Sequence, residues 1–462
     1  HQTIELQDLR DHSIVDVFGR LADKPMTSIL VSGGSHDCAR FSILGYDPFC
    51  VLRSKGRETR LTRNGSTETI TGDPLAVLES VLNQNRVAAA NPSLPITAGG
   101  IGYFGYEMKN LLEKLPQTAR DDLDLPDMHF CFYRSLLIHD GKYNTWQLCT
   151  FTPPGERDDH ESRVRDLLAA CSGPAPKRQK GGSSGRSSVQ SNFTKQEYLD
   201  TVEKIRQYII NGHIYQANLS QRFSAPFTGD PYLSFTQLFG MNPAPFYAYL
   251  DCGDFKVVST SPERFLFRKG AFVETRPIKG TRPRGKTAPD DESLKKELLE
   301  SAKDEAELSM IVDLMRNDLS KVCCGDSVRV AEHKRIEGYT NVFHLVSVVQ
   351  GRLRDDLSPL DPIRACFPGG SITGCPKIRA MEIIDELEPN ARGVYTGSIG
   401  YISFHDSMDL NIAIRTSVVK NGTIYFNVGG AVVYDSDPEE EYLETLYKGE
   451  CSIKNLQASY ES

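Results

Sequence analysis

One segment carries much of the information in this chain: Thr275-Arg276-Pro277-Ile278-Lys279-Gly280-Thr281-Arg282-Pro283-Arg284. Lys279 lies there between a proline-stiffened approach and a glycine, in a run that also holds several arginines. Cationic neighbours favour the neutral form of an amine, and a neutral amine is a nucleophile. Taken alone, the segment fits a basic loop that contacts phosphate or solvent. The motifs that follow it favour a reactive amine.

Size and composition restrict the class of protein. The chain has 462 residues, more than one hydrophobic core usually supports, so we expect two domains or one large elaborated domain. Hydrophobic residues at 39% and charged residues at 25% are ordinary for a soluble globular protein. The formal net charge of -8 argues against nucleic-acid binding, because the surface as a whole carries no excess positive charge to offset repulsion by the phosphates.

Cysteine usage and hydropathy indicate the compartment. The 11 cysteines show neither a metal-binding spacing nor a disulfide framework, which favours reduced thiols in the cytoplasm. No apolar run approaches the length of a transmembrane helix, and the N-terminus lacks a signal-peptide pattern. We therefore expect no association with a membrane.

A composition shift suggests the domain boundary. Residues 173–190 are rich in Gly, Pro, Ser and basic side chains, which predicts a flexible linker or disordered loop. This segment separates a β-rich N-terminal domain, residues 1–172, from a larger domain, residues 191–462. Within the first domain, glycines alternate with aromatics at 99–107, a pattern that favours close strand packing over phosphate binding.

The larger part of the chain mixes helices and strands. Apolar spacing predicts helices at 195–211 and 292–319. Strand candidates follow at 399–404, 410–418 and 423–428. Because helices and strands do not alternate regularly, an α+β fold with large mixed or antiparallel sheets is favoured over a doubly wound parallel sheet.

Two acidic pairs have helical spacing. Asp304 and Glu307 are three residues apart, as are Glu441 and Glu444, so each pair shares one helix face. Two such faces turned toward each other would suit Mg²⁺, which prefers carboxylate and water oxygens. For either pair alone, a solvated acidic surface remains the alternative. Lys448, one turn after Glu444, is either an ion-pair partner or a ligand for a bound anion.

Several further positions can bind anions or carry protons. The Gly-rich loop 368–377 precedes a helical stretch and can offer N–H groups to an anion, although it lacks the Walker A pattern. Residues 429–431 (Gly-Gly-Ala) are expected to form a turn that presents N–H groups to a carboxylate, and Arg415 can fork onto a carboxylate. Glu263 is either neutralised by Arg264 or, if buried near a reacting group, able to shuttle a proton.

Taken in order, these motifs resemble those of the chorismate-utilising enzyme family. The resemblance covers residues 191–450 and rests on segments 215–221, 261–265, 277–281, 306–318, 343–347, 368–377, 414–416 and 441–445. It implies an anthranilate synthase component I-like fold, with large mixed or antiparallel sheets in a sandwich-like core surrounded by helices.

Within the family, the residue at position 279 distinguishes the reactions. The resemblance implies that members which form anthranilate and pyruvate usually have Ala there, whereas members which aminate chorismate at C4 have Lys. Members that form isochorismate or salicylate place a water-activating lysine where this chain has Gln216. The implied product is therefore 4-amino-4-deoxychorismate, for 4-aminobenzoate and folate biosynthesis. The alternatives are anthranilate formation and a non-catalytic relative that binds chorismate or a partner.

The resemblance also implies roles for individual residues. Lys279 would attack C2 of chorismate, and Glu263 would act as general acid for the departing C4 hydroxyl. Glu307 and Glu444 would bind Mg²⁺, with Asp304 and Glu441 as outer or water-mediated partners. The implied substrate-binding residues are Gln216, Gly280, Thr281, His344, Thr373, Tyr395, Arg415, Gly429, Gly430, Ala431 and Lys448.

Two further ligands are implied. Ammonia would come from a glutamine amidotransferase partner, since the chain has no convincing Cys-His-Glu glutaminase signature of its own. In relatives, a pocket in the N-terminal part can hold tryptophan. The residues that partly match its lining are Ser32, Pro245, Phe246 and Tyr247.

Overall fold

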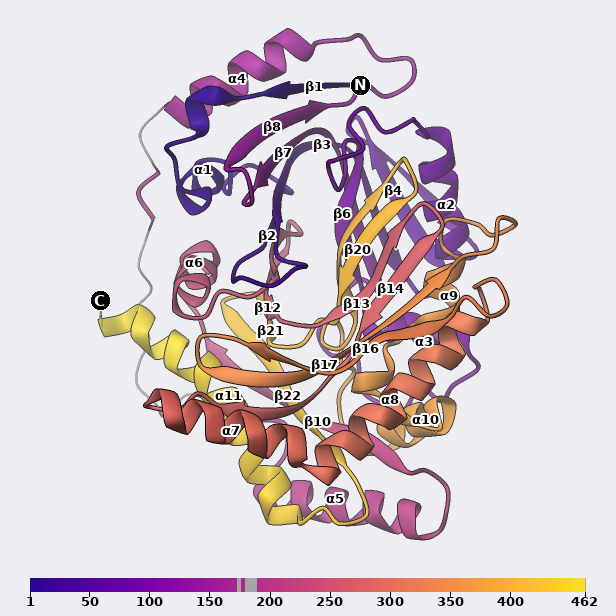
Figure 1. Cartoon of the computed structure of the whole chain (residues 1–462). Coiled ribbons are helices and arrows are strands. Elements are labelled where there is room, and N and C mark those ends of the chain that lie inside the picture. The colour runs from indigo at the N-terminus through magenta and orange to yellow at the C-terminus, as the bar shows by residue number, and fades with distance from the viewer. Residues whose placement is uncertain (173–175, 179–188, 462) are drawn as a thin grey trace.

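The computed structural model describes residues 1–172, 176–178 and 189–461 (Figure 1). Most of the predicted linker therefore lies outside the described residues. Hydrogen bonds connect the named strands of this described part into one branched network, in which each strand pairs antiparallel with its neighbours. The network branches at β3, whose first half pairs with β2 and whose second half pairs with β4.

The first branch runs across the molecule to the strand that carries Lys279. Its strand order is β5-β4-β3-β7-β6-β19-β20-β13-β14-β17-β16, and β15 extends the β14 edge along β17. The strands are β3 (Phe41–Lys55), β4 (Glu58–Arg63), β5 (Ser66–Thr71), β6 (Gly99–Phe104), β7 (Met128–Asp140), β13 (Arg264–Lys269), β14 (Phe272–Arg276), β15 (Ile278–Pro283), β16 (Arg329–Gly338), β17 (Val342–Arg352), β19 (Ser398–Ser403) and β20 (Ser407–Asn411).

The second branch leaves β3 in the order β2-β11-β12-β21-β22-β10 and ends on two short strands. Its strands are β2 (Ser28–Val31), β9 (Gln190–Ser191), β10 (Gln216–Pro226), β11 (Phe246–Asp251), β12 (Phe255–Ser261), β18 (Gly374–Cys375), β21 (Thr416–Lys420) and β22 (Thr423–Val432). At the other end of the molecule, β1 (Gln2–Glu5) and β8 (Thr145–Thr150) continue the network from β7.

Helices cover the outer faces of the two branches (Figure 1). Helices α7 and α8 lie against the β15–β17 end of the first branch and α9 packs against α8, whereas α5, α10 and α11 lie against β10 and β22 of the second branch. The helices are α1 (Ile14–Gly19), α2 (Pro74–Gln84), α3 (Lys109–Leu112), α4 (His160–Ser172), α5 (Lys195–Ile210), α6 (Pro231–Met241), α7 (Ala288–Glu300), α8 (Ala302–Ser320), α9 (Asp361–Cys366), α10 (Lys377–Leu387) and α11 (Pro438–Glu461), with short 3₁₀ turns η1 (Gln7–Leu9), η2 (Tyr106–Met108) and η4 (Gly370–Ile372).

A hydrophobic core lies between the branches. One cluster combines Ile101 of β6 and Ile399 of β19 with Val257 of β12 and Val418 of β21, so both branches contribute to it. The glycines of β6 pack as the sequence suggests, because a Cβ at Gly102 would lie 2.0 Å from the carbonyl oxygen of His129. The predicted α+β class, with antiparallel sheets enclosed by helices, is confirmed.

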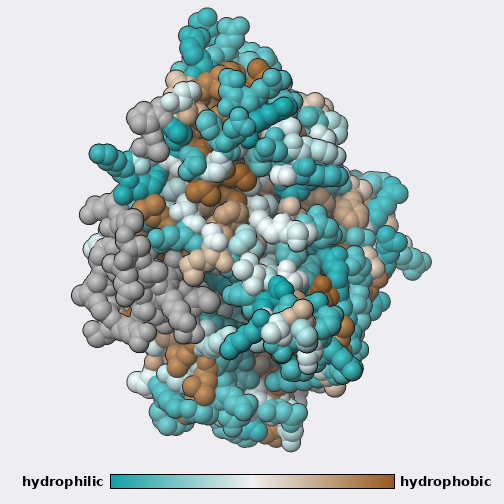
Figure 2. All heavy atoms as spheres, turned by 60° about the vertical axis from the view of Figure 1, so that its left-hand side comes forward, coloured by the Kyte–Doolittle hydropathy of each residue, from teal (hydrophilic) through white to brown (hydrophobic). Residues whose placement is uncertain are grey.

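Strands from residues 1–172 and from residues 191–462 are hydrogen-bonded to one another. β2 pairs with β11, and β6 pairs with β19. The two predicted domains therefore share their sheets, and the boundary between them stays a prediction. No helix in the described part is long and apolar enough to cross a membrane. On the face shown in Figure 2, hydrophobic residues form scattered groups among hydrophilic ones.

Three local predictions were wrong. The helix predicted at 292–319 is two helices, because Ser301 leaves the helical conformation and its side chain caps α8 by accepting from the Asp304 N–H. The strand predicted at 410–418 is interrupted between β20 and β21, where Arg415 has φ of 50°. Residues 429–431 do not form a turn: they lie within β22, in register with β10.

Candidate active site

A strand irregularity positions Lys279. In the β15–β17 ladder, Lys279 pairs with Leu345 and Thr281 pairs with His344, which leaves Gly280 as an extra, bulged residue. Gly280 has φ of 70°, and a Cβ there would lie 2.9 Å from Leu298 and 3.1 Å from Asp304. Glycine therefore satisfies both the left-handed backbone and the close approach of α7 and α8.

The amine of Lys279 lies between the two branches of the sheet network. Its Nζ donates a hydrogen bond to the carbonyl oxygen of Ser371, at 3.3 Å. Burial lowers its pKa below the ordinary lysine value, whereas the carboxylates of Glu307, Glu263 and Glu444 act to raise it. Glu307 comes from α8 and Glu444 from α11, so helices from both branches meet at this amine.

The physical cause of this shift differs from the one the sequence suggests. Burial has the largest effect on the Lys279 pKa, and Lys448 is the cation that lowers it further. The nearby arginines are occupied elsewhere: Arg276 pairs with Asp37 and Glu274, Arg282 with Glu297 and Asp304, and Arg284 with Asp291. Solvent exclusion, rather than a crowd of arginines, favours the neutral amine.

Glu263 is buried next to this amine, on the turn between β12 and β13. Burial raises its carboxyl pKa to about 7, against opposing contributions from Ser371, Lys279, Arg415 and the Ile278 N–H. Its neighbour Arg264 does not neutralise it, because that guanidinium pairs with Asp409 at 2.8 Å and Glu274 at 2.7 Å. Glu263 can therefore hold or release a proton near neutral pH.

Three predicted substrate-binding residues form a hydrogen-bonded chain. His344 Nδ1 lies 3.0 Å from Thr281 Oγ1, and His344 Nε2 lies 3.2 Å from Arg415 Nη2. A guanidinium can only donate, so Nε2 accepts and the ring proton is on Nδ1. Burial and the Arg415 charge lower the His344 pKa to about 3, which keeps the ring neutral.

Three other predicted binding residues have contacts of their own. Lys448 Nζ donates to Gly429 O at 3.2 Å and also pairs with Glu444. Thr373 is buried in the Gly-rich loop, and its carbonyl oxygen accepts from Asn218 N at 2.8 Å. Tyr395 is buried, 6% exposed, facing the guanidinium of Arg392.

Gln216, the first residue of β10, has a buried side-chain amide without a hydrogen-bond partner among the described residues. Its side chain is fully buried, yet neither the amide oxygen nor the amide nitrogen has a hydrogen-bond partner among the described residues. Burying an unpaired amide costs free energy unless a ligand or water satisfies it. The position is therefore suited to bind a polar group.

Glu441 and Glu444 lie against β22, and the charge of Glu444 also acts on Glu307 of the other acidic pair. A Cβ on Gly430 would lie 3.0 Å from Glu441 Oε2 and 3.5 Å from Glu444 Oε1. Because glycine has no side chain, both carboxylates can approach the strand at this position. Burial raises the pKa of Glu307 and of Glu441, and the Glu444 charge raises both further. In Glu444 itself, Lys448 offsets burial and holds the pKa below its ordinary value.

Asp304 is turned to a different partner. Its carboxylate pairs with Arg282 at 3.1 Å, and its backbone N–H is capped by Ser301. Within the described residues, no group of three or more His, Cys, Asp or Glu side chains is arranged to hold a metal ion. The repulsion that Glu444 exerts on Glu307 and on Glu441 nevertheless fits a bound cation, and carboxylate oxygens are the donors that Mg²⁺ prefers.

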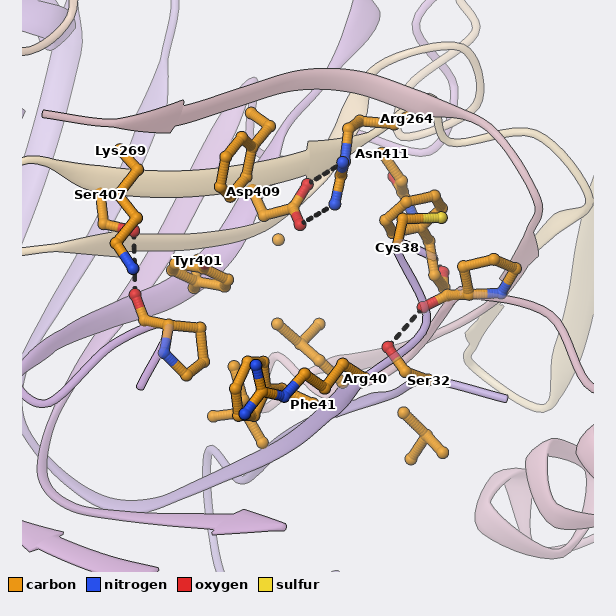
Figure 3. Close-up of a pocket in the computed structure, with 18 of the residues that line it drawn as sticks. Ser32, Cys38, Arg40, Phe41, Arg264, Lys269, Tyr401, Ser407, Asp409 and Asn411 are labelled. Atoms are coloured by element: carbon orange, nitrogen blue, oxygen red, sulfur yellow. Dashed lines mark hydrogen bonds and ion pairs between the residues drawn. The ribbon is translucent and has the colours of Figure 1, made fainter. Parts of the chain in front are cut away.

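The four residues of the predicted tryptophan pocket lie together. Ser32, Pro245, Phe246 and Tyr247 line a cavity of about 310 Å³, and Ser32 Oγ donates to Pro245 O at 2.8 Å (Figure 3). Figure 3 also shows Arg264 paired with Asp409 at the wall of this cavity. None of the described lining residues belongs to the group around Lys279.

Sequence reasoning missed Ser371. Its carbonyl oxygen accepts from Lys279 Nζ at 3.3 Å, and its side chain acts to lower the pKa of Glu263. From the sequence, the Gly-rich loop 368–377 was expected to offer N–H groups to an anion, whereas its contact with Lys279 uses a carbonyl oxygen. A hydroxyl residue inside that loop was the available signal.

We expect Glu263→Gln to change how stability depends on pH. Because the folded-state pKa of Glu263 is raised to about 7, its ionisation destabilises the fold as pH rises from the unfolded value toward and past 7. Glutamine removes this cost. Relative to wild type, the variant should gain on the order of 1–3 kcal/mol of unfolding free energy between pH 5 and pH 8. Urea unfolding of both proteins at pH 5 and at pH 8 measures the gain. The prediction is contradicted if the variant and wild type differ in unfolding free energy by the same amount at both pH values.

Comparison with known proteins places this chain in a family. Residues 37–454 match the family of chorismate binding enzymes. Aminodeoxychorismate synthase component 1 of Escherichia coli (strain K12) is 40% identical over 442 residues, which cover 95% of each chain. Anthranilate synthase component 1 of Thermus thermophilus is 39% identical over 450 residues, covering 96% of this chain and 95% of its own.

The fold agrees with this relationship. The crystal structure of anthranilate synthase component I from Streptococcus pneumoniae superposes with a TM-score of 0.80 at 36% identity, over 90% of this chain and 93% of its own. The anthranilate synthase component I-like fold expected from the motifs is thereby confirmed. The chain belongs to the family of chorismate binding enzymes.

Proposed function

We propose that this chain is aminodeoxychorismate synthase component 1, which aminates chorismate at C4 to give 4-amino-4-deoxychorismate. One observation supports the proposal: the chain buries a lysine, Lys279, whose amine is made less basic and lies beside a protonatable glutamate, Glu263. Several relatives at 36–42% identity bear this name. We expect the product to serve 4-aminobenzoate and folate synthesis in the cytoplasm.

The geometry supports a two-step substitution. The neutral Lys279 amine attacks C2, the ring double bonds shift, and the C4–O bond breaks. Glu263 in its acid form gives its proton to the departing hydroxyl, which leaves as water, and the carboxylate then takes a proton from the alkylated amine. Ammonia adds at C4, the double bonds shift back, and the C2–N bond breaks as Glu263 returns its proton to the departing Lys279 nitrogen; the carboxylate then takes a proton from the new C4 ammonium. The enolpyruvyl group stays intact throughout.

Polar groups around Lys279 would hold the substrate. Arg415 and Lys448 supply positive charge for the two carboxylates of chorismate, and the unpaired amide of Gln216 offers a donor and an acceptor. His344, with its proton on Nδ1, would orient Arg415 and Thr281 rather than titrate. The full set proposed to contact substrate is Gln216, Gly280, Thr281, His344, Thr373, Tyr395, Arg415, Gly429, Gly430, Ala431 and Lys448.

Glu307 and Glu444 would hold Mg²⁺, with Glu441 behind Glu444 and Asp304 at the edge. Glu441 accepts a 2.6 Å hydrogen bond from Ser436 Oγ, which restrains its carboxylate. The metal would neutralise a carboxylate of a dianionic substrate, which otherwise resists a nucleophile at this site. Lys448 would then be released from Glu444 toward the substrate.

A separate component would supply ammonia. The names of the related proteins as component 1 favour a second component, and we propose a glutamine amidotransferase subunit. Delivery from such a partner would keep ammonia unprotonated until it reaches C4.

Anthranilate formation is the second candidate, because anthranilate synthases are also close relatives with the same fold. The presence of Lys279 favours C4 amination. An amine that occupies C2 covalently directs the incoming ammonia to C4, whereas anthranilate formation requires ammonia at C2.

Product analysis with a matched pair of lysine variants tests the function. Wild type supplied with chorismate, Mg²⁺ and ammonium should form 4-amino-4-deoxychorismate and no fluorescent anthranilate. Lys279→Ala should lower amination by at least roughly 10³-fold, because the nucleophile is lost. Lys296→Ala, at an exposed position of α7, should match wild type. Fluorescent anthranilate as the main wild-type product would contradict the proposal.

The metal assignment predicts a specific loss in Glu307→Gln. Removal of this carboxylate should weaken Mg²⁺ binding, measured by calorimetry, and raise the Mg²⁺ concentration needed for half-maximal activity by at least roughly 10- to 100-fold. The control is Glu305→Gln on the exposed face of the same helix, where the carboxylate pairs with Lys334. Wild-type Mg²⁺ dependence in Glu307→Gln would remove Glu307 from the metal site.

A further inference from the structure

Arg392 is a buried arginine that takes no part in the proposed chemical steps. It lies in the segment between α10 and β19, and its side chain is 1% exposed. Its Nε and Nη2 donate to the two carboxylate oxygens of Glu388, at 2.8 Å and 2.7 Å, so its charge is paired. A buried guanidinium needs acceptors for five N–H groups, and Glu388 supplies acceptors for two of them.

The other three N–H groups of Arg392 reach three separate segments. Nη2 donates to Asn218 O on β10, at 2.6 Å. Nη1 donates to Ile372 O in the Gly-rich loop, at 3.0 Å, and to Thr396 Oγ1, at 3.3 Å. One side chain therefore joins β10, the Gly-rich loop and the segment before β19, and each of its five N–H groups has an acceptor.

Two of these acceptors adjoin residues proposed to contact chorismate on the loop and on β10. Ile372 directly precedes Thr373, and Asn218 lies two residues after Gln216. Asn218 N also donates to Thr373 O at 2.8 Å, so the loop and the strand are tied to each other at this point. The bonds from Arg392 thus fix the separation between Thr373 and Gln216.

The third acceptor adjoins Tyr395, which is also proposed to contact chorismate. Thr396 Oγ1 accepts from Arg392 and donates in turn to Tyr395 O at 2.6 Å. The guanidinium lies 6.0 Å from the ring centroid of Tyr395. The same cation therefore restrains both the backbone and the ring of this tyrosine.

We infer that Arg392 is a positioning residue of the substrate site, whose guanidinium sets the spacing between the Gly-rich loop, β10 and Tyr395. This inference rests on the substrate contacts of the proposed function. The Arg392 backbone is held separately, because Arg392 N and Gly393 N each donate to the Glu107 carboxylate at 2.9 Å. Replacing the Arg392 side chain therefore releases its acceptors without removing the bonds that hold its own backbone.

Chorismate binding tests this role without turnover. In a Lys279→Ala background, which cannot form the proposed adduct, calorimetry with Mg²⁺ measures the Kd for chorismate. Adding Arg392→Lys keeps a cation beside Glu388 but offers one nitrogen in place of the planar fork. The Kd should rise roughly 10- to 100-fold, the range for replacing a residue that orients ligand-binding groups. With Lys279 intact, Arg392→Lys should raise the KM for chorismate more than it lowers kcat.

Arg222→Lys in the same background is the matched control. Arg222 is also a buried arginine, lies on β10 and forks onto a carboxylate, that of Asp122, at 2.9 Å and 2.6 Å. The segment around Asp122 carries none of the residues proposed to contact substrate. The control should therefore bind chorismate with the same Kd as the Lys279→Ala background.

A second variant covers the case in which Arg392→Lys does not fold by circular dichroism. Arg392→Met combined with Glu388→Gln leaves no unpaired buried charge and keeps an amide oxygen for the Ser220 N–H, which donates to Glu388 at 2.7 Å. This double variant should show the same rise in Kd.

The outcomes separate this inference from the proposed function. An unchanged Kd in a folded Arg392 variant, or an equal rise in Arg222→Lys, would overturn the positioning role. Failure of both Arg392 variants to fold would assign Arg392 to stability and overturn it as well. Chorismate is the substrate of both C4 amination and anthranilate formation, so a wild-type chain that makes anthranilate would overturn the function and leave this inference standing.

Discussion

Burial of the Lys279 amine beside carboxylates is the constraint on which the rest of the site depends. Desolvation favours the neutral amine, whereas Glu307, Glu263 and Glu444 favour the ammonium form. A cation that neutralises Glu307 and Glu444 would remove much of the opposing field. The same residues would then bind the metal and make the amine reactive, so the proposed metal and the proposed nucleophile depend on each other.

The residues that set the Lys279 pKa come from distant parts of the chain. Lys279 lies at a glycine bulge on one branch of the sheet network, Glu444 lies on a helix that packs against the other branch, and Ser371 lies on a loop between them. Each position is held by backbone geometry or by a buried ion pair, such as Arg392 with Glu388. The site is therefore a product of the way the two branches meet.

The sequence predicted the α+β class, the antiparallel sheets and the helical placement of both acidic pairs, because these follow from local periodicity. Residues 429–431 were expected in a turn, since two glycines usually mark one, but pairing with β10 keeps them extended. The break at Ser301 was missed because the apolar spacing continues across both helices. The low basicity of Lys279 was inferred from neighbouring arginines, although burial, which depends on tertiary structure, has the largest effect.

The contacts of Ser371 and the unpaired amide of Gln216 could not be read from the sequence for the same reason. Each depends on which backbone groups come together when strands far apart in the chain pair. The separation of the Ser32 cavity from the Lys279 site is likewise a property of the folded arrangement.

The central claim is that Lys279 is a nucleophile, and intact mass spectrometry tests it most directly. Protein mixed with chorismate and Mg²⁺ in the absence of ammonia, then quenched in acid, should gain the mass of one chorismate less one water. Peptide mapping should place the added mass on Lys279. Product formation on adding ammonia, with no such adduct at any quench time or with the adduct on another residue, would contradict the account.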